Sequence, residues 1–270
     1  MTSSFHPDST AFSLIIPAFN EEHRIFPYLD SIVAYFSRRQ GSYEIIVIDD
    51  GSRDGTANAI EAYRRRAPAV KLIRLPTNTG KGAAVRAGMT AAQGHLRLMA
   101  DADGATAIQE LDALEAAIAQ GADIAVGSRA MGSRDRRYRV QARWHRTILG
   151  NLFNGIVGRM GVAGIGDTQC GFKLFRQSVA DDLFSVARID GYGFDLELLF
   201  IANRRGYRIA EIPINWSDRP GSKVRVVRDG LSMFRELAMV RRNVGIGLYE
   251  RQLPNGSVGE FCEVADCPPA

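Results

Sequence analysis

The stretch LMADADGAT, residues 98–106, decides the fold expected for this chain. An apolar run ends there in two carboxylates, Asp101 and Asp103, and a glycine, Gly104, follows directly. Because successive strand residues alternate faces, two acids at a spacing of two point the same way where the strand persists. Asp and Gly are also common turn formers, so the motif alone favours a solvated turn after a strand. The rest of the chain instead favours a ligand site at this motif.

Strand and helix patterns alternate along the chain, and the apolar strands are nearly continuous. This alternation indicates a mainly parallel sheet that is covered by helices on both faces. Ligands of such sheets bind beyond the carboxyl ends of the strands. Pro17, Asp50 and Asp103 each end a predicted strand, so we expect them to meet at one edge as a site. The predicted strands include residues 13–16, stopped by Pro17, and 70–75, and the predicted helices include 56–66, 108–120 and 230–242.

The composition is that of an ordinary soluble protein. The 270 residues are 46% hydrophobic and 24% charged, which suits one large α/β domain or two small ones. Apolar runs stay below the ~20 residues of a membrane span, and no secretory signal is recognised. The three cysteines, Cys170, Cys262 and Cys267, form no metal-ligand pattern and favour a reducing compartment. A cytoplasmic location is therefore expected.

The net charge of +4 is unevenly distributed. Residues 129–146 hold seven arginines and one acid, Asp135. Such a patch implies an anionic partner, which is a phosphate, a nucleic acid or a membrane surface. An apolar stripe at helical spacing follows, typical of a core helix and also suited to docking on an anionic membrane. Its residues are Ile148, Leu149, Leu152, Phe153, Ile156, Val157 and Met160.

Two further features bear on the site chemistry. Hard carboxylate oxygens at a sheet edge suit Mg²⁺ or Mn²⁺, which prefers carboxylate plus phosphate ligands to an all-protein cage. The glycine-rich turn TGKG, residues 79–82, opens a helix and is able to bind an anion there. The full phosphate-loop spacing is missing, so an ATPase is disfavoured.

Several short motifs occur in an order and spacing that is specific as a set. They are PAFNEE (17–22), IDDGSRDGT (48–56), NTGKGAAVRAGM (78–89), ADADGAT (100–106), GSR (127–129), DTQCGFKLF (167–175), FDLELL (194–199) and WSDRPGSKV (216–224). The set resembles the inverting GT-A glycosyltransferases of the polyprenyl-phosphate sugar transferase type. The last three motifs resemble the dolichyl-phosphate beta-glucosyltransferase branch most. The resemblance implies a Rossmann-like, mainly parallel α/β fold in a single domain, residues 12–249. The polar ends, residues 1–11 and 250–270, are expected to be disordered.

The same resemblance implies a reaction. The enzyme is expected to transfer a hexose to polyprenyl or dolichyl phosphate with inversion of the anomeric centre. Glucose from UDP-glucose is the first candidate. Mg²⁺ or Mn²⁺ is the expected cofactor, and the enzyme is expected to contact the cytoplasmic membrane face peripherally. Mannosyl relatives usually carry Gln or His two residues after the second Asp, whereas this chain has Ala105. That difference favours UDP-glucose over GDP-mannose, which stays an alternative.

Roles carry over from the family residue by residue. Pro17, Phe19 and Glu21 are expected to line the nucleotide pocket, Asp50 to contact the base and Lys81 to assist the nucleotide. Asp101 is expected to contact the ribose or the metal, and Ala102 is expected to lie beside it in the nucleotide site. Asp103 is the main predicted metal ligand. Arg129 and Arg143 are expected to contact the acceptor phosphate, with Gln169 and Lys173 nearby. The predicted catalytic set is Asp103, Arg129, Arg143, Gln169, Lys173 and Glu197.

Three alternatives remain open. A GT-A transferase that acts on a soluble hydroxyl needs a carboxylate base, and Asp195 or Glu197 would serve. On a helix these two point about 200° apart, so one at most faces the site. A non-catalytic sugar-nucleotide-binding protein is disfavoured because Asp101 and Asp103 are intact. A nucleic-acid partner fits the arginine run but explains none of the acids at the sheet edge, so no nucleic acid is expected.

Overall fold

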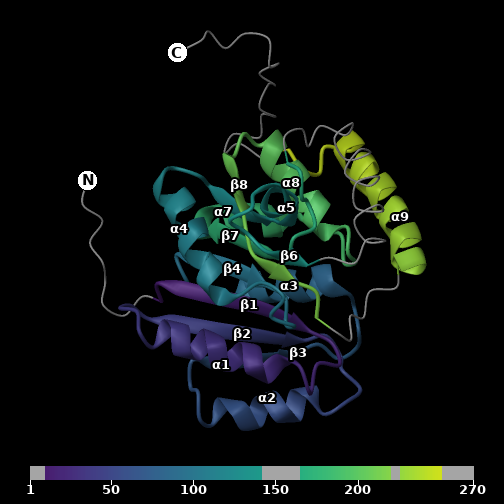
Figure 1. The fold of residues 1–270 in the computed structure, drawn as a ribbon. Helices are drawn as coiled ribbons and strands as arrows, with labels where there is room; N and C mark the ends of the chain where they lie inside the picture. Colours follow the sequence, from purple (N-terminus) through teal and green to yellow (C-terminus); the bar gives the residue numbers. More distant parts are fainter. Residues whose placement is uncertain (1–9, 142–164, 220–225, 251–270) are drawn as a thin grey trace.

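A seven-stranded sheet forms the centre of the structure, with helices on both of its faces (Figure 1). The computed structural model describes residues 10–141, 165–219 and 226–250. The strand order is β3-β2-β1-β4-β7-β5-β8, and all neighbours pair in parallel except β7, which runs antiparallel to β4 and β5. The predicted mainly parallel α/β fold is therefore confirmed. Arg143, the apolar stripe of residues 148–160 and most of both predicted disordered ends lie outside the described residues.

The elements follow one another in a regular alternation through β5. The strands are β1 (Phe12–Ala18), β2 (Tyr43–Asp49), β3 (Val70–Arg74), β4 (Leu96–Ala100), β5 (Ile124–Ser128), β6 (Val140–Gln141), β7 (Phe172–Arg176), β8 (Ile209–Pro213) and β9 (Trp216–Ser217). The helices are α1 (Ile25–Phe36), α2 (Thr56–Arg64), α3 (Lys81–Ala91), α4 (Leu111–Ala119), α5 (Arg129–Arg134), α7 (Gln177–Val186), α8 (Phe194–Arg204) and α9 (Val226–Gly245). A short 3₁₀ turn, Ile108–Glu110, precedes α4.

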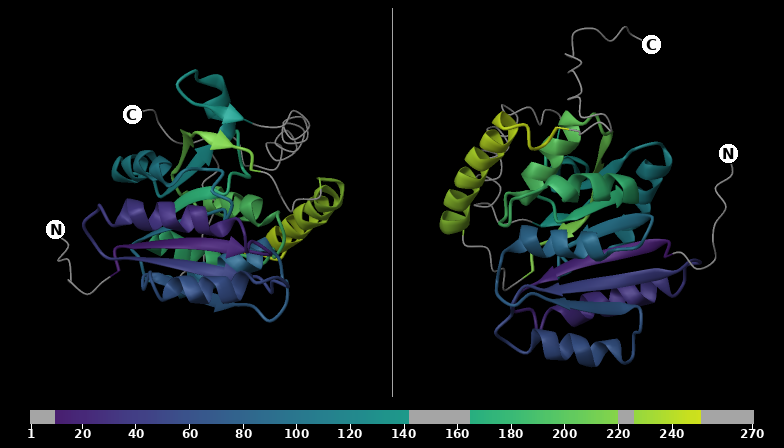
Figure 2. Two further views of the ribbon diagram at one scale, coloured as in Figure 1. Left: turned by 60° about the horizontal axis from the view of Figure 1, so that its bottom comes forward. Right: turned by 180° about the vertical axis from the view of Figure 1, so that it is seen from behind.

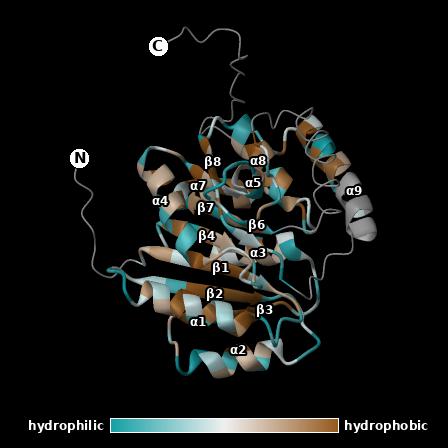
Figure 3. Cartoon of the chain, in the orientation of Figure 1, coloured by the Kyte–Doolittle hydropathy of each residue, from teal (hydrophilic) through white to brown (hydrophobic). Residues whose placement is uncertain are grey.

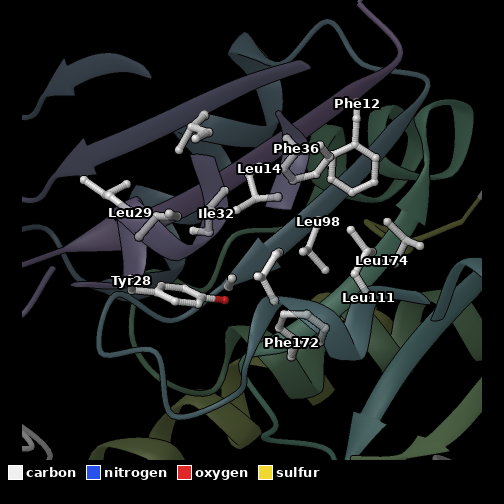
Figure 4. Close-up of a cluster of buried hydrophobic side chains, with 14 of the residues drawn as sticks. Phe12, Leu14, Tyr28, Leu29, Ile32, Phe36, Leu98, Leu111, Phe172 and Leu174 are labelled. Carbon is white, nitrogen blue, oxygen red and sulfur yellow. The ribbon is translucent and has the colours of Figure 1, made fainter. Parts of the chain in front are cut away.

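The central strands are apolar on both faces because each face is covered. In β1, Leu14 and Ile16 face the cluster built on α1, α2 and α4, which Figure 4 shows in part. Ile15 of the same strand faces the opposite cluster, which contains residues of α3, α7 and α8. Brown, apolar strands at the centre of Figure 3 show this arrangement. The near-continuous apolar runs are thus explained by helices packed on two sides.

Pro17 does not end its strand, in contrast to the prediction. β1 continues to Ala18 and stays in register with β2 at Pro17 and Ile48. The Ala18 carbonyl accepts from the Asp50 amide, so even-numbered residues of β1 bond toward β2. Pro17 therefore turns its nitrogen toward β4, whose pairing with β1 ends at Ile15. A proline is tolerated there because no ladder bond requires its missing N–H.

The antiparallel strand β7 matters most for the site. It lies between β4 and β5, with Lys173 opposite Met99 on one side and Val126 on the other. Because β7 runs against its neighbours, its first residue lies at the edge where β4 and β5 end. The loop that precedes β7, residues 165–171, is therefore delivered to the carboxyl edge of the sheet.

The helix α9 lies at the periphery, on the side away from α2 (Figures 1 and 2). Leu237 and Val240 anchor it to the α3, α7 and α8 face of the core, whereas Met239 is exposed. Glu236 accepts a hydrogen bond from the Gly193 amide at 2.7 Å, directly before α8. None of the described helices combines the length and apolar character needed to cross a bilayer.

Candidate active site

The two predicted acids lie on a tight turn, Asp101–Gly104, that follows β4 and is called the acidic turn below. The Gly104 amide lies 3.4 Å from the Asp101 carbonyl, and Gly104 has a φ of +63°. A side chain at that φ would be strained, which explains the glycine. Asp103 accepts from the Ala105 amide at 3.0 Å, and 40% of the Asp101 side chain is exposed. Both carboxylates thus sit at the carboxyl edge of the sheet.

Gly171 brings the loop before β7 directly against the acidic turn. A Cβ placed on Gly171 would lie only 2.1 Å from Oδ2 of Asp101. Any larger residue would push the two segments apart. Sequence reasoning did not single out Gly171, although the motif DTQCGFKLF contains it.

Alternating charges connect the acidic turn with the core. Nζ of Lys81, the first residue of α3, lies 2.5 Å from Oδ1 of Asp101. Burial lowers the pKa of Lys81, but the charges of Asp101 and Asp195 outweigh it and hold the pKa above its ordinary value. Asp195 in turn lies 2.5 Å from Nζ of Lys173. The series Lys173, Asp195, Lys81 and Asp101 therefore alternates in sign from the core to the site.

Lys173 and Glu197 do not have the predicted access to substrate. Lys173 is fully buried and donates to the Cys170 carbonyl at 2.7 Å as well as to Asp195. Glu197 is also fully buried, and its oxygens accept from the amides of Arg188 and Ile189 and from the Tyr249 hydroxyl. The predicted catalytic roles of Lys173 and Glu197 are therefore corrected. Each side chain is hydrogen-bonded to buried partners and is not accessible to a substrate. Asp195 and Glu197 do face different ways, as helical geometry requires.

Asp103 has an environment that changes its acidity. Burial and the negative charge of Asp101 raise the pKa of Asp103, while the Ala105 amide, Arg24 and Lys81 oppose the rise. Arg24 was missed by sequence reasoning. Its guanidinium pairs with both carboxylate oxygens of Glu21, one of them at 2.7 Å from Nε. The predicted nucleotide-pocket residue Glu21 is thus buried and acts by holding Arg24 near Asp103.

Asp50 supports a neighbouring loop instead of lying open to a base. Its buried carboxylate accepts from the amides of Thr79 and Gly80, from the Thr79 hydroxyl and from the Asn78 side chain, at 2.8–2.9 Å. These four donors match the roughly four lone-pair sites of a carboxylate. The predicted base contact is therefore corrected to a structural role: Asp50 fixes the loop that presents Lys81.

The amino end of α3 is closed by another part of the chain. The Asp190 carbonyl accepts from the amides of Gly82 at 2.7 Å and Ala83 at 3.2 Å. A Cβ on Gly82 would lie 2.4 Å from the Ile189 carbonyl, so the glycine is needed for this close approach. Arg86 pairs with the Asp190 carboxylate. The glycines of TGKG therefore serve packing against residues 189–190, which excludes the phosphate-loop interpretation.

Arg129 lies at the end of β5 in a bidentate pair with Asp167. Nε and Nη2 of Arg129 lie 2.7 and 2.8 Å from the two Asp167 oxygens, and the Arg129 amide also donates to Asp167. Burial opposes this pairing, but Arg129 holds the pKa of Asp167 below its ordinary value. The guanidinium lies 5.5 Å from the Trp216 ring centroid. Arg129 is thus held rigidly beside the site, with about a third of its side chain exposed.

The strand β9 connects this pair with the acidic turn. The Ser217 amide donates to the Ala105 carbonyl at 3.0 Å, so the residue after Trp216 is bonded to the residue after Gly104. Ala102 and Ala105 are both buried. Pro17, Phe19 and Gln169 are half-buried. Their contacts with nucleotide or acceptor remain predictions.

The donor set fits a divalent cation that is shared with a ligand. Over residues 10–141, 165–219 and 226–250, no three His, Cys, Asp and Glu side chains are grouped to hold a metal alone. Asp101 and Asp103 supply two carboxylates, and Mg²⁺ or Mn²⁺ commonly takes its remaining ligands from phosphates and water. The hydroxyl of Tyr28, buried near this turn, has no hydrogen-bond partner within the described residues. Burial raises the pKa of Tyr28, and the charges of Asp101 and Asp103 raise it further.

Comparison with known proteins identifies the family. Residues 13–184 match the family described as glycosyl transferase family 2. The chain belongs to this family. It is a glycosyltransferase, and its relatives include a dolichyl-phosphate beta-glucosyltransferase of Trichomonas vaginalis, 41% identical over 82% of this chain and 68% of the relative. Enzymes with the same description from Drosophila melanogaster and Homo sapiens are 38% and 37% identical, over 86% and 85% of this chain and 74% of each relative.

Solved structures of glycosyltransferases share the fold. Glucosyl-3-phosphoglycerate synthase from Mycobacterium tuberculosis, in complex with UDP, superposes with a TM-score of 0.63 at 21% identity, over 87% of this chain and 80% of that one. Mannosyl-3-phosphoglycerate synthase from Rubrobacter xylanophilus gives a TM-score of 0.63 at 19% identity, over 90% and 77%. The family-2 chain therefore has a GT-A-like fold, as the resemblance implied.

Proposed function

We propose that this family-2 enzyme transfers glucose from UDP-glucose to dolichyl phosphate or a related polyprenyl phosphate. The observation that carries the proposal is the acidic turn, which presents Asp101 and Asp103 at the sheet edge beside Lys81. The donor and acceptor are suggested by relatives at 37–41% identity, all described as dolichyl-phosphate beta-glucosyltransferases. Direct attack of the acceptor on an α-linked donor would invert the anomeric centre and yield a β-linked product.

The residues of the turn fit a role in holding the donor diphosphate. Asp101 and Asp103 would hold Mg²⁺ or Mn²⁺, and the ion would supply Lewis-acid stabilisation of the leaving diphosphate. One fold relative, the Mycobacterium tuberculosis synthase, was crystallised with Mn²⁺ and UDP-glucose, and it is 19% identical to this chain. Lys81 adds a positive charge beside the same turn. Its pairing with Asp101 at 2.5 Å supports a role for its ammonium group in holding the diphosphate.

A phosphate acceptor suits the charges on the other side of the site. A phosphomonoester is already ionised at neutral pH, so it attacks without a strong general base. The enzyme has to bring two anionic groups together, and arginine matches phosphate oxygens with its planar fork. Arg129 is held by Asp167 and Trp216, and it lies near enough to Asp101 for that charge to act on it. We assign it to the acceptor phosphate, together with Arg143.

The competing hydroxyl acceptor is less well supported by the geometry. It needs a carboxylate base at the acceptor side, and the candidates were Asp195 and Glu197. Asp195 is buried in its pair with Lys173, and Glu197 is buried among backbone amides. Because both carboxylates are committed to buried partners, neither is open to an acceptor hydroxyl.

A lipid acceptor places the enzyme at a membrane surface. Arginines beside an amphipathic helix suit docking on anionic lipid, and α9 carries Arg235, Arg241 and Arg242 on its exposed side. We therefore propose peripheral contact with the cytoplasmic membrane face.

One assay tests donor and acceptor together. Purified protein of all 270 residues, with Mn²⁺ or Mg²⁺, is offered labelled UDP-glucose, GDP-mannose and further sugar nucleotides. Polyprenyl phosphate or free polyprenol is the acceptor. Label is expected in the organic phase only with UDP-glucose and polyprenyl phosphate. Efficient use of GDP-mannose alone would overturn the glucosyl assignment, and transfer to free polyprenol would overturn the phosphate acceptor.

A further inference from the structure

We infer that Tyr28 of α1 positions the acidic turn, because its hydroxyl donates a hydrogen bond to an oxygen of that turn when the turn takes up a divalent cation. The inference rests on the proposed metal-dependent function and adds a residue that none of the sequence motifs contains.

The first observation is an unpaired hydroxyl. Tyr28 is 6% exposed, and its hydroxyl is the one buried side-chain polar atom without a hydrogen bond in the part of the chain that the structure describes. A buried donor without an acceptor costs free energy, because it has given up its bonds to water. A phenylalanine would fill almost the same space without this cost. The hydroxyl therefore calls for an acceptor in another state of the protein.

The second observation is the placement of the ring under the acidic turn. A Cβ on Gly104 would lie 3.0 Å from the Tyr28 ring, so the glycine end of the turn packs on the ring base. The hydroxyl end points away from α1 toward Leu98 and Phe172 (Figure 4). Phe172 directly follows Gly171, the residue that touches Asp101. The ring base thus packs under Gly104, and the hydroxyl lies near enough to Asp101 and Asp103 for their charges to raise its pKa.

The chemistry of the turn supplies what the hydroxyl lacks. Ionised carboxylates accept hydrogen bonds and donate none. In this structure Asp101 bonds to Lys81, and Asp103 bonds to the Ala105 amide. A cation that draws the two carboxylates together changes the position of the turn and gives the hydroxyl an acceptor. Hydrogen bonds of this kind orient metal ligands, and their loss typically weakens metal binding by about 10–100-fold.

The variant Tyr28→Phe tests this inference without an activity measurement. Free Mn²⁺ is measured by electron paramagnetic resonance during titration of the full-length protein in the presence of UDP, and urea unfolding is measured without metal. Tyr249→Phe is the matched control, because Tyr249 is also buried but already donates to Glu197 at 2.5 Å.

The inference expects Tyr28→Phe to bind Mn²⁺ about tenfold more weakly, while its metal-free form unfolds at the same or a higher urea concentration than wild type. Tyr249→Phe should show the reverse, with unchanged Mn²⁺ binding and lower stability. Unchanged Mn²⁺ affinity in Tyr28→Phe would overturn the inference, as would a loss of metal-free stability like that of Tyr249→Phe. If folded wild type binds neither UDP nor Mn²⁺, the proposed function fails and the inference fails with it.

Discussion

Nζ of Lys81 lies 2.5 Å from Oδ1 of Asp101, and this pair joins the start of α3 to the end of β4. The two residues are 20 positions apart in the sequence, and each belongs to a different motif. Their contact shows that TGKG contributes through its lysine side chain, since residues 189–190 cover the helix end itself. It also places a positive charge close to Asp103, the main predicted metal ligand.

The pH dependence of Mn²⁺ binding should show the effect of the positive charge of Lys81. Burial and Asp101 raise the pKa of Asp103, and Lys81 opposes the rise. Because protons and cations compete for the carboxylate, Mn²⁺ binding should weaken at a higher pH than for an ordinary aspartate. Lys81→Met removes the opposing charge, so the pH midpoint for Mn²⁺ binding should move further upward. Titration between pH 4 and 8 measures it, and a downward shift would contradict the assignment.

Replacement of the main predicted metal ligand should abolish transfer but keep the fold. Asp103→Asn retains an oxygen for the Ala105 amide. Metal stabilisation of the leaving group is worth several kcal/mol, so turnover should fall roughly a thousandfold at about 1.4 kcal/mol per decade. Steady-state transfer at saturating Mn²⁺ checks this. Unchanged turnover, or full wild-type activity in EDTA, would remove Asp103 from the mechanism.

Removal of the Arg129 guanidinium should affect the acceptor far more than the donor. A charge-assisted contact of ~2–3 kcal/mol corresponds to a rise of about thirty- to a hundredfold in the apparent KM for polyprenyl phosphate. Arg129→Lys should rescue only partly, because an ammonium lacks the planar fork. Arg66→Ala is a suitable control, since Arg66 is exposed just after the far helix α2 and pairs with Asp30. Equal effects on the KM of UDP-glucose and of the acceptor would argue against a phosphate contact.

Glu197→Gln should lower stability and leave the chemistry intact. The substitution removes the charge that strengthens bonds from the amides of Arg188 and Ile189. Hydrogen bonds to charged groups contribute ~1.5–3 kcal/mol each, so urea unfolding should shift clearly toward lower concentration. Transfer per folded molecule should match wild type. A stable variant without activity would instead restore the predicted substrate role.

Cys170 should resist alkylation until the protein unfolds. Burial raises the pKa of its thiol to about 12, and the charge of Asp167 adds to the rise. A raised pKa means that the folded state prefers the protonated thiol, so its contribution to stability is lost as pH rises from about 9 to about 12. In a Cys262→Ser/Cys267→Ser variant, iodoacetamide at pH 8 should label the protein only in denaturant. Rapid labelling of the folded form would show that the thiol is accessible.

Much of the fold follows from local pattern. Apolar strands such as Ile45–Ile48 and helices with a single apolar stripe, such as α1, are recognisable because burial follows the strand and helix periods. The placement of Asp101 and Asp103 at a carboxyl edge follows from the same alternation. The direction of β7 does not, because the residues of a five-residue strand carry no signal of whether it runs parallel or antiparallel to its neighbours.

The roles of individual site residues depended on partners distant in the sequence. Lys173 and Asp195 are 22 positions apart, and Glu197 and Tyr249 are 52 apart. Spacing in the sequence does not show whether these residues are buried. A lysine or glutamate in a motif looks the same whether its side chain binds a ligand or pairs with a buried group. The sequence by itself determined which edge of the sheet is acidic and which family the motifs resemble. Only the tertiary structure decided that Glu197, Lys173 and Asp50 hold the scaffold while Lys81 and Tyr28 meet the acidic turn, because hydrogen-bond partners of buried charges are chosen by packing.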